Sequence, residues 1–309
     1  MKAYRNSALA LAAIVAALAS VPLTASGDEA PAPSPLARRY TEGQTLVYRI
    51  RGSNHGRDLT TSYAAQARGF VRRDPGGWLF EEFAWIELEQ DGKPVELPEA
   101  SLAFRQQLSL TRDSPMQIPK LAAAHPALVA PVLDLLNFYG DLSLAGRLTQ
   151  LRAAGDHAYF AHNLAHSWAD GRVLLVGEAS VDFDVLLVDV KGAERTATVA
   201  VRHVQPAEPA IKISADWMRK PVADGPNNWT QVRRSPAGKY VASIGREVVK
   251  VTLILDTTDG RLVSATLDNP VDILERECDD FAHTRCAEPV RYRVFREVEL
   301  LSGPASTPG

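Results

Sequence analysis

The feature that most constrains this chain is an alternation of apolar and polar side chains that returns in one segment after another. Leu46, Tyr48 and Ile50, for example, share one face of a segment whose other face carries Thr45, Val47, Arg49 and Arg51. Side chains of a β-strand point alternately to its two faces, so this period predicts strands with one face in a core and the other in water. Strands of that kind are typical of antiparallel sheets. We therefore expect a mainly β protein of the α+β type, built on one large curved antiparallel sheet.

Ten strands are predicted from this alternation and from the turn residues between the segments. Asp-Gly pairs at 91–92 and 259–260 indicate tight hairpins. The third strand carries Trp and Phe on both faces, which predicts cover on both sides. The strands are expected near 45–51, 59–73, 78–90, 102–110, 172–190, 195–204, 229–235, 239–256, 261–268 and 289–300.

A helical insertion is predicted at about 120–153, because the apolar period lengthens there to that of a helix. Its apolar positions include Leu128, Val132, Leu135, Leu136 and Tyr139. Gly140 is expected to end this helix, and a second short helix is expected from 142 to 151. The first helix is apolar nearly all round and must be covered on several sides, so we expect it to pack on the concave face of the sheet.

The N-terminal segment predicts export. Lys2 and Arg5 precede an apolar run, and small residues follow it, which is the pattern of a signal peptide over residues 1–27. A membrane anchor is the alternative. Residues 28–39, rich in Pro and Ala, predict a disordered leader, and 302–309 a flexible tail. A single β-rich domain is expected over 40–301, with a division into two domains near 155–170 as the alternative, and the mature protein is expected in the periplasm or outside the cell.

Cys278 and Cys286 are the only cysteines, and they lie eight residues apart in a polar stretch. In an exported chain such a pair predicts a disulfide. The alternatives are a redox pair and half of a metal site completed by His283, Asp279 or Asp280.

Three of the seven histidines lie in the stretch from His157 to His166. On a helix, His162 and His166 would face the same way, as in some zinc enzymes. The Glu of the zinc protease motif is missing, because Asn163 follows His162. We therefore expect surface histidines in a mobile loop and no metal site, with a hydrolase or metal-dependent enzyme as an alternative function.

The formal net charge of −3 gives no support to a nucleic-acid partner, which would require a concentrated basic face. No nucleotide-binding loop and no nucleophile elbow occurs in the sequence. The sequence therefore predicts no cofactor and identifies no catalytic residue, and it leaves enzymatic activity undecided.

A signal peptide followed by a long antiparallel sheet with one apolar helix resembles the half-barrel lipoprotein carriers and lipid-binding lipoproteins of bacterial envelopes. The resemblance covers roughly residues 40–300 in strand pattern alone, and the cysteine that carries a lipid anchor is absent. It implies a protein that is not integral to the membrane and that binds a lipid or another apolar ligand between sheet and helix. A structural or protein-interaction module without a ligand is the alternative. The residues expected to line the pocket are Leu128, Val132, Leu136, Tyr139 and Trp168.

Overall fold

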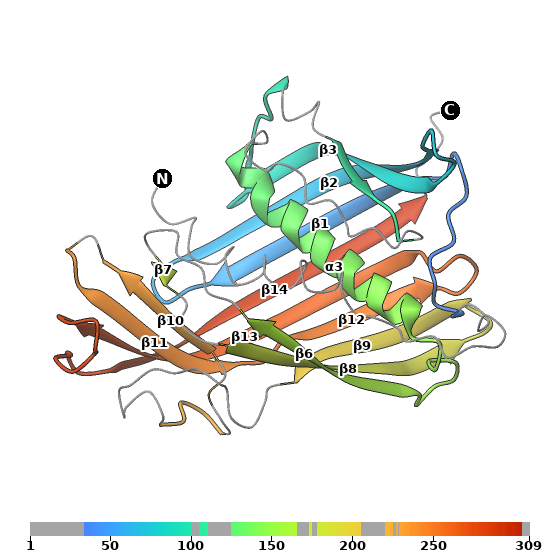
Figure 1. Ribbon diagram of the computed structural model, residues 1–309. Helices are drawn as coiled ribbons and strands as arrows, with labels where there is room; N and C mark the ends of the chain where they lie inside the picture. The colour runs from blue at the N-terminus through green and yellow to red at the C-terminus, as the bar shows by residue number, and fades with distance from the viewer. Residues whose placement is uncertain are drawn as a thin grey trace.

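The computed structural model describes residues 34–99, 105–110, 125–165, 173–174, 178–204, 220–224, 227, 229–235 and 237–304. In this part of the chain the protein is mainly β, and one long helix lies across one face of a large twisted sheet (Figure 1). The predicted fold class is confirmed. The signal peptide predicted at residues 1–27 lies outside the described residues.

The sheet has 14 strands, and its neighbours pair in the order β4-β3-β2-β1-β14-β13-β12-β9-β8-β6. Strand β5 pairs with β3. On the second half of β13, β11 pairs with β13, β10 pairs with β11, and β7 pairs with β10. Within the described residues β4 and β6 do not pair with each other, so the sheet is open. The strands are β1 (Thr45–His55), β2 (Thr60–Arg73), β3 (Leu79–Gln90), β4 (Lys93–Pro94), β5 (Arg105–Leu108), β6 (His157–Ala165), β7 (Val173–Leu174), β8 (Glu178–Lys191), β9 (Thr196–Val204), β10 (Trp229–Arg234), β11 (Tyr240–Glu247), β12 (Lys250–Asp256), β13 (Leu262–Cys278) and β14 (Val290–Pro304).

The alternation in the sequence is the alternation of burial in the sheet. Leu46, Tyr48 and Ile50 of β1 are buried, whereas Arg49 and Arg51 on the opposite face of the strand are exposed. Between β3 and β4 the Asp-Gly pair has positive φ at both residues, as a tight hairpin of the expected kind requires. The buried face of β1 and the hairpin between β3 and β4 were therefore both predictable from local sequence.

Strand β13 is longer than predicted, and it pairs with two different strands on one side. Its first half pairs with β12 and its second half with β11, and Pro270 lies between the two halves. Proline has no N–H to give to a ladder, and the chain passes from β11 to β12 beside it, where Val248 N donates to the Pro270 carbonyl. The single strand predicted over 239–256 is therefore wrong, because this segment forms two strands.

The helix α3 (Val129–Arg147) follows a single 3-10 turn, η3 (Pro126–Leu128). It packs against β1 and β2, and its residues from Pro131 to Leu142 are all buried. The predicted packing on the sheet is confirmed, but the second helix is wrong, since α3 continues through Gly140 to Arg147. A glycine costs only about 1 kcal/mol inside a helix, which the surrounding packing outweighs. Pro126–Arg147 is long and apolar enough to span a bilayer, yet most of it is buried inside the protein, as in a core helix.

Both predicted flexible ends need correction. Residues 34–39 belong to the core, because Leu36 is buried there and Arg38 bonds to Gln44 and lies 3.4 Å from an Asp259 oxygen. We call residues 34–39 the N-terminal strap. At the other end β14 extends to Pro304, which pairs with Leu46, so the tail does not begin at residue 302.

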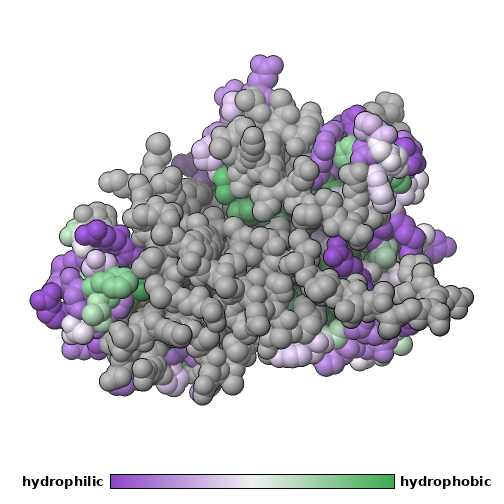
Figure 2. All heavy atoms as spheres, viewed as in Figure 1, coloured by the Kyte–Doolittle hydropathy of each residue, from purple (hydrophilic) through white to green (hydrophobic). Residues whose placement is uncertain are grey.

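The aromatic residues of β3 also differ from expectation. Phe83 and Trp85 of β3 are buried, but Trp78, which lies just before the strand, is 48% exposed, and Ile86 on the other face of the strand is 37% exposed. The second face of β3 is therefore only partly covered, so the expectation of cover on both sides is wrong. In the view of Figure 2 the described side chains at the left and right margins are mostly hydrophilic, with one small apolar patch over the region of β10 and β11.

Candidate functional site

The candidate site is the interface between α3 and the sheet. Leu128, Val132, Leu136 and Tyr139, predicted to line a pocket there, are all at most 1% exposed and belong to the main core. Trp168 lies outside the described residues. The structure therefore brings four of the five predicted residues together on one helix, and their role as a pocket wall stays a prediction.

One polar group at this interface is the tyrosine–glutamate cluster, which comprises Tyr48, Glu81 and Tyr139. Tyr48 Oη donates to Glu81 Oε1 over 2.6 Å, and Tyr139 Oη donates to Glu81 Oε2 over 2.8 Å. Burial raises the pKa of the Glu81 carboxyl, although Arg38 and the two hydroxyls oppose the shift. Gly69 makes room for the cluster, since a Cβ there would collide with Glu81 Oε1. The cluster joins β1, β3 and the helix.

A second polar group, the aspartate–arginine cluster, comprises Asn54, Tyr63, Asp134 and Arg296. Asp134 of α3 accepts hydrogen bonds from Tyr63 of β2 and from the Arg296 guanidinium of β14. Arg296 also donates to Asn54 Oδ1 over 2.7 Å. Burial tends to lower the pKa of Arg296, but the Asp134 carboxyl beside it more than compensates, so the pKa of Arg296 is raised.

Two further polar side chains of α3, Asn137 and Asp141, are buried but differ from Asp134 in having no partner among the described residues. Asn137 is 7% exposed, and neither its Nδ2 nor its Oδ1 has a hydrogen-bond partner. Asp141 is 4% exposed, and burial raises the pKa of its carboxyl to about 7. Within the described residues the Asp141 side chain makes no hydrogen bond or ion pair.

The histidine stretch does not form the predicted loop. His157 and His162 lie in β6, a strand at the edge of the ordered path of the sheet, and His166 lies outside the described residues. The helical spacing that suggested a zinc site is therefore absent at His162. His157 Nε2 lies 2.7 Å from Asp184 Oδ1 of the neighbouring strand β8. Among the described residues no group of three His, Cys, Asp or Glu side chains could hold a metal ion.

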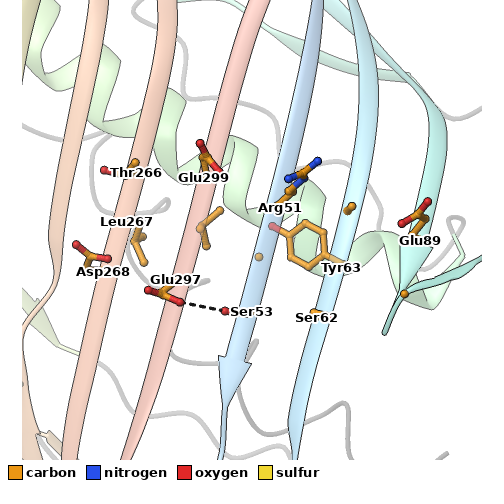
Figure 3. A pocket seen from close by; sticks show the side chains of 14 residues that line it. Arg51, Ser53, Ser62, Tyr63, Glu89, Thr266, Leu267, Asp268, Glu297 and Glu299 are labelled. Carbon is orange, nitrogen blue, oxygen red and sulfur yellow. Dashed lines mark hydrogen bonds between the residues drawn. The ribbon is translucent and has the colours of Figure 1, made fainter.

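A groove of about 530 Å³ lies on the outer face of the sheet, away from α3 (Figure 3). Tyr63, one of its lining residues, sends its side chain to α3, so its neighbours Ser62 and Ala64 point to the outer face. The side chains around the groove are of mixed charge and mostly exposed. They include Arg51, Glu89, Asp268, Glu297 and Glu299. Sequence analysis did not single out this groove, because its residues come from five strands.

The predicted disulfide is confirmed. Cys278 and Cys286 are bonded, with an S–S distance of 2.06 Å. The bond closes a loop that follows the second half of β13, far from the main core under α3.

Comparisons with known proteins identify no family for this chain. No protein-family model and no curated protein matches it. A solved structure described as "Asymmetric conductivity of engineered proteins" is 9% identical, with 84% of this chain and 99% of that chain covered, at a TM-score of 0.17. At this TM-score the likeness carries no argument about fold or function.

The polar residues of the interface were missed by sequence analysis, although each leaves a signal. Glu81 falls on the alternating face that also carries Phe83 and Trp85, and Asp134 lies between apolar residues in the first half of the helix. A charged residue at a periodic core position is seldom buried without a partner. A polar residue at an apolar periodic position could therefore have indicated Glu81 and Asp134 as members of buried polar clusters. It could not have indicated which residues they bind.

Proposed function

We propose that the protein is an exported binding protein or carrier for an apolar ligand, which is held between α3 and the concave face of the sheet. The observation that supports this most is the way the helix is attached. Buried hydrogen-bonded polar groups join it to the sheet at Asp134 and at Tyr139. Such pairs specify position more than they stabilise, since apolar residues of the same shape often stabilise a core as well or better. A helix fixed in this way can be placed accurately and still separate from the sheet.

The dimensions of the sheet support the same proposal. Ten strands in order, spaced about 4.8 Å apart, extend over about 40 Å. A helix with its side chains is only about 10 Å wide, so α3 covers a fraction of that width. The apolar core nevertheless continues to Val185 and Leu187 of β8 and Val199 of β9. An elongated apolar ligand would match a face of this extent.

Binding of an uncharged, environment-sensitive naphthylamine dye tests the proposal. The wild type is expected to give a saturable fluorescence increase that Leu136→Glu abolishes, because the substitution places a charge at a fully buried position of α3. Leu301→Glu is the matched control, since Leu301 is 48% exposed on the outer face of β14 and binding should be unchanged.

The fold of each variant is checked by circular dichroism. If Leu136→Glu does not fold, Leu136→Phe serves in its place, because added volume narrows a pocket without adding charge. No saturable binding by the folded wild type contradicts the proposal and leaves a structural or interaction module. Equal binding by wild type, Leu136→Phe and Leu301→Glu contradicts the placement of the ligand at α3.

A further inference from the structure

Two polar side chains with unpartnered atoms lie side by side on the face of the sheet that α3 covers. Arg296 of β14 reaches Asp134 of α3, so its side chain is on that face, and Asn269 of β13 is its direct partner in the register of the two strands. Directly paired residues point to the same face of a sheet, with their Cβ atoms about 5 Å apart. Both residues are buried, Arg296 at 9% and Asn269 at 5% exposure. One small group can therefore contact both side chains of this Asn269–Arg296 pair.

The pair has one hydrogen-bond donor and one acceptor that no described residue uses. Arg296 Nη1 donates to Asn54 and Nη2 to Asp134, whereas Nε has no partner. Asn269 Nδ2 donates to Glu247 Oε1 over 2.9 Å, and Oδ1 has no partner. Strand β11, which carries Glu247, and strand β14 lie on opposite sides of β13, so Oδ1 points toward Arg296. Buried polar atoms of native proteins are nearly always hydrogen-bonded, so a donor and an acceptor left open beside each other indicate a ligand or a water molecule.

An apolar row crosses the sheet from a point next to this pair. Leu267 and Val298 are two residues from Asn269 and Arg296 along their strands, so they share the same face. From Leu267, directly paired and buried apolar residues continue across β12, β9 and β8. The members of the row are Val298, Leu267, Val251, Val201 and Val185. Four strand spacings separate its ends, which amounts to about 19 Å, so the face combines an elongated apolar surface with a polar pair at one end.

Building on the proposed function, we infer that Asn269 and Arg296 bind the polar head of the apolar ligand, whose chain lies along the row. The head is neutral and has both an acceptor and a donor, as in a long-chain alcohol or a primary amide. Its oxygen accepts a hydrogen bond from Arg296 Nε, and its O–H or N–H group donates to Asn269 Oδ1. A carboxylate head is disfavoured, because the charge of Arg296 is already paired with Asp134 and the Glu247 carboxyl lies next to Asn269.

Competition against the naphthylamine dye separates recognition of the head from binding of the chain. Decanol and decyl methyl ether share a ten-carbon chain and an acceptor oxygen, but only the alcohol has a donor hydrogen. Asn269→Leu removes the acceptor for that hydrogen, so the ratio of decanol affinity to ether affinity should fall about tenfold from its wild-type value, as expected for one hydrogen bond. Affinity for the dye and for the ether should be unchanged. Decanoate should compete with the wild type no better than the ether.

Further variants assign the contacts to particular atoms. Arg296→Lys keeps a cation beside Asp134 and removes Nε, so it should weaken binding of decanol and of the ether by a similar factor and leave dye binding unchanged. Asn137→Leu is the matched control, since Asn137 of α3 is also a buried amide with unpartnered atoms but is not part of the pair, and its ratio should equal that of the wild type. If Asn269→Leu does not fold, the double variant Asn269→Leu, Glu247→Gln serves in its place, because it leaves no carboxyl without its amide donor.

Three results would contradict the inference. An unchanged ratio in Asn269→Leu means that only water satisfies Asn269 Oδ1. Equal falls in Asn137→Leu and Asn269→Leu indicate a general effect of removing a buried amide. Decanoate that competes as strongly as decanol excludes a site for a neutral head. Absence of dye binding by the wild type contradicts the proposed function itself, whereas dye binding with an unchanged ratio in Asn269→Leu contradicts this inference alone.

Discussion

The region under α3 and the outer end of the sheet beyond Pro270 are stabilised by different interactions. The first has the main core, whose large side chains, such as Phe83, Trp85 and Phe138, are at most 1% exposed. The second, which we call the stapled flap, comprises residues 229–247 and 271–286 and lies at the lower left of Figure 1. Among the described residues its own apolar cluster comprises four buried side chains, namely Val232, Ala242, Ile244 and Leu274.

The flap supplements this small core with other interactions. The disulfide closes its loop, and Glu275 accepts hydrogen bonds from Ser243, Tyr292 and Arg233. Small cores seldom stabilise a fold without such additions. The comparison teaches that polar groups serve different purposes in the two regions. In the flap they add stability to a thin layer, whereas under α3 they fix the position of a helix that apolar packing already covers.

The largest expected effect concerns the aspartate–arginine cluster. Arg296→Leu removes one partner of a buried ion pair and leaves the Asp134 carboxyl without its cation, which should lower the free energy of unfolding by about 3 to 5 kcal/mol. The double variant Arg296→Leu, Asp134→Leu should recover most of that loss, since an apolar pair of similar volume avoids the cost of buried charge. Urea unfolding of the three proteins measures both. A double variant as unstable as the single one would mean that the cluster itself stabilises the core.

The next effect is a dependence of stability on pH in the region under α3. The folded pKa of Asp141, about 7, lies above its usual value of 3.8, so the folded state holds this proton more tightly than the unfolded state. Stability should therefore fall as pH rises from about 4 to about 8, by on the order of 4 kcal/mol. Asp141→Asn should remove this contribution and be more stable than the wild type at pH 8. Unfolding curves at a series of pH values measure it, and parallel curves for the two proteins would contradict it.

Removal of the disulfide should affect the flap alone. The double variant Cys278→Ala, Cys286→Ala frees a short loop, which costs about 2.6 kcal/mol on the chain-entropy account. Hydrogen exchange should become faster at the backbone amides of β11 and stay unchanged at those of α3. Faster exchange in both regions would show that the flap and the main core unfold together, and the comparison would then fail.

The smallest effect is expected at Asp280, in the disulfide loop. Its carboxylate accepts hydrogen bonds from the backbone N–H groups of Arg285 and Thr284 and from the Thr284 hydroxyl, which lowers the pKa to about 2. A lowered pKa stabilises the folded state above pH 4, and this contribution is lost as pH falls through 2, opposite in sign to that of Asp141. Asp280→Asn should therefore weaken the flap slightly at pH 7, as amide exchange in the loop would show. Asp279→Asn is the control, and an equal effect there would contradict the role of the bonds made by Asp280.

Much of the fold was predictable because it depends on local pattern. The alternation at Leu46, Tyr48 and Ile50 predicts a strand and its buried face, and the Asp-Gly pair at 91–92 predicts a hairpin. The errors share one physical cause, which is that contacts distant in sequence outweigh local preference. The N-terminal strap has the composition of a disordered leader, yet Leu36 is buried in the main core. Gly140 would end an isolated helix, but packing continues α3 past it.

The sequence by itself determined that the chain forms an antiparallel sheet with an apolar helix, and that Cys278 and Cys286 pair. These follow from side-chain periodicity and spacing, which act over a few residues. Only the tertiary structure decided that Asp134 meets Arg296, a residue 162 positions away, and that Glu81 meets Tyr139. It also decided that Asn137 and Asp141 are buried without a partner in the part of the chain that the structure describes. Such pairings depend on strand order and on the position of α3, which are determined by the packing of the whole core. The residues next to each partner in the sequence therefore do not indicate them.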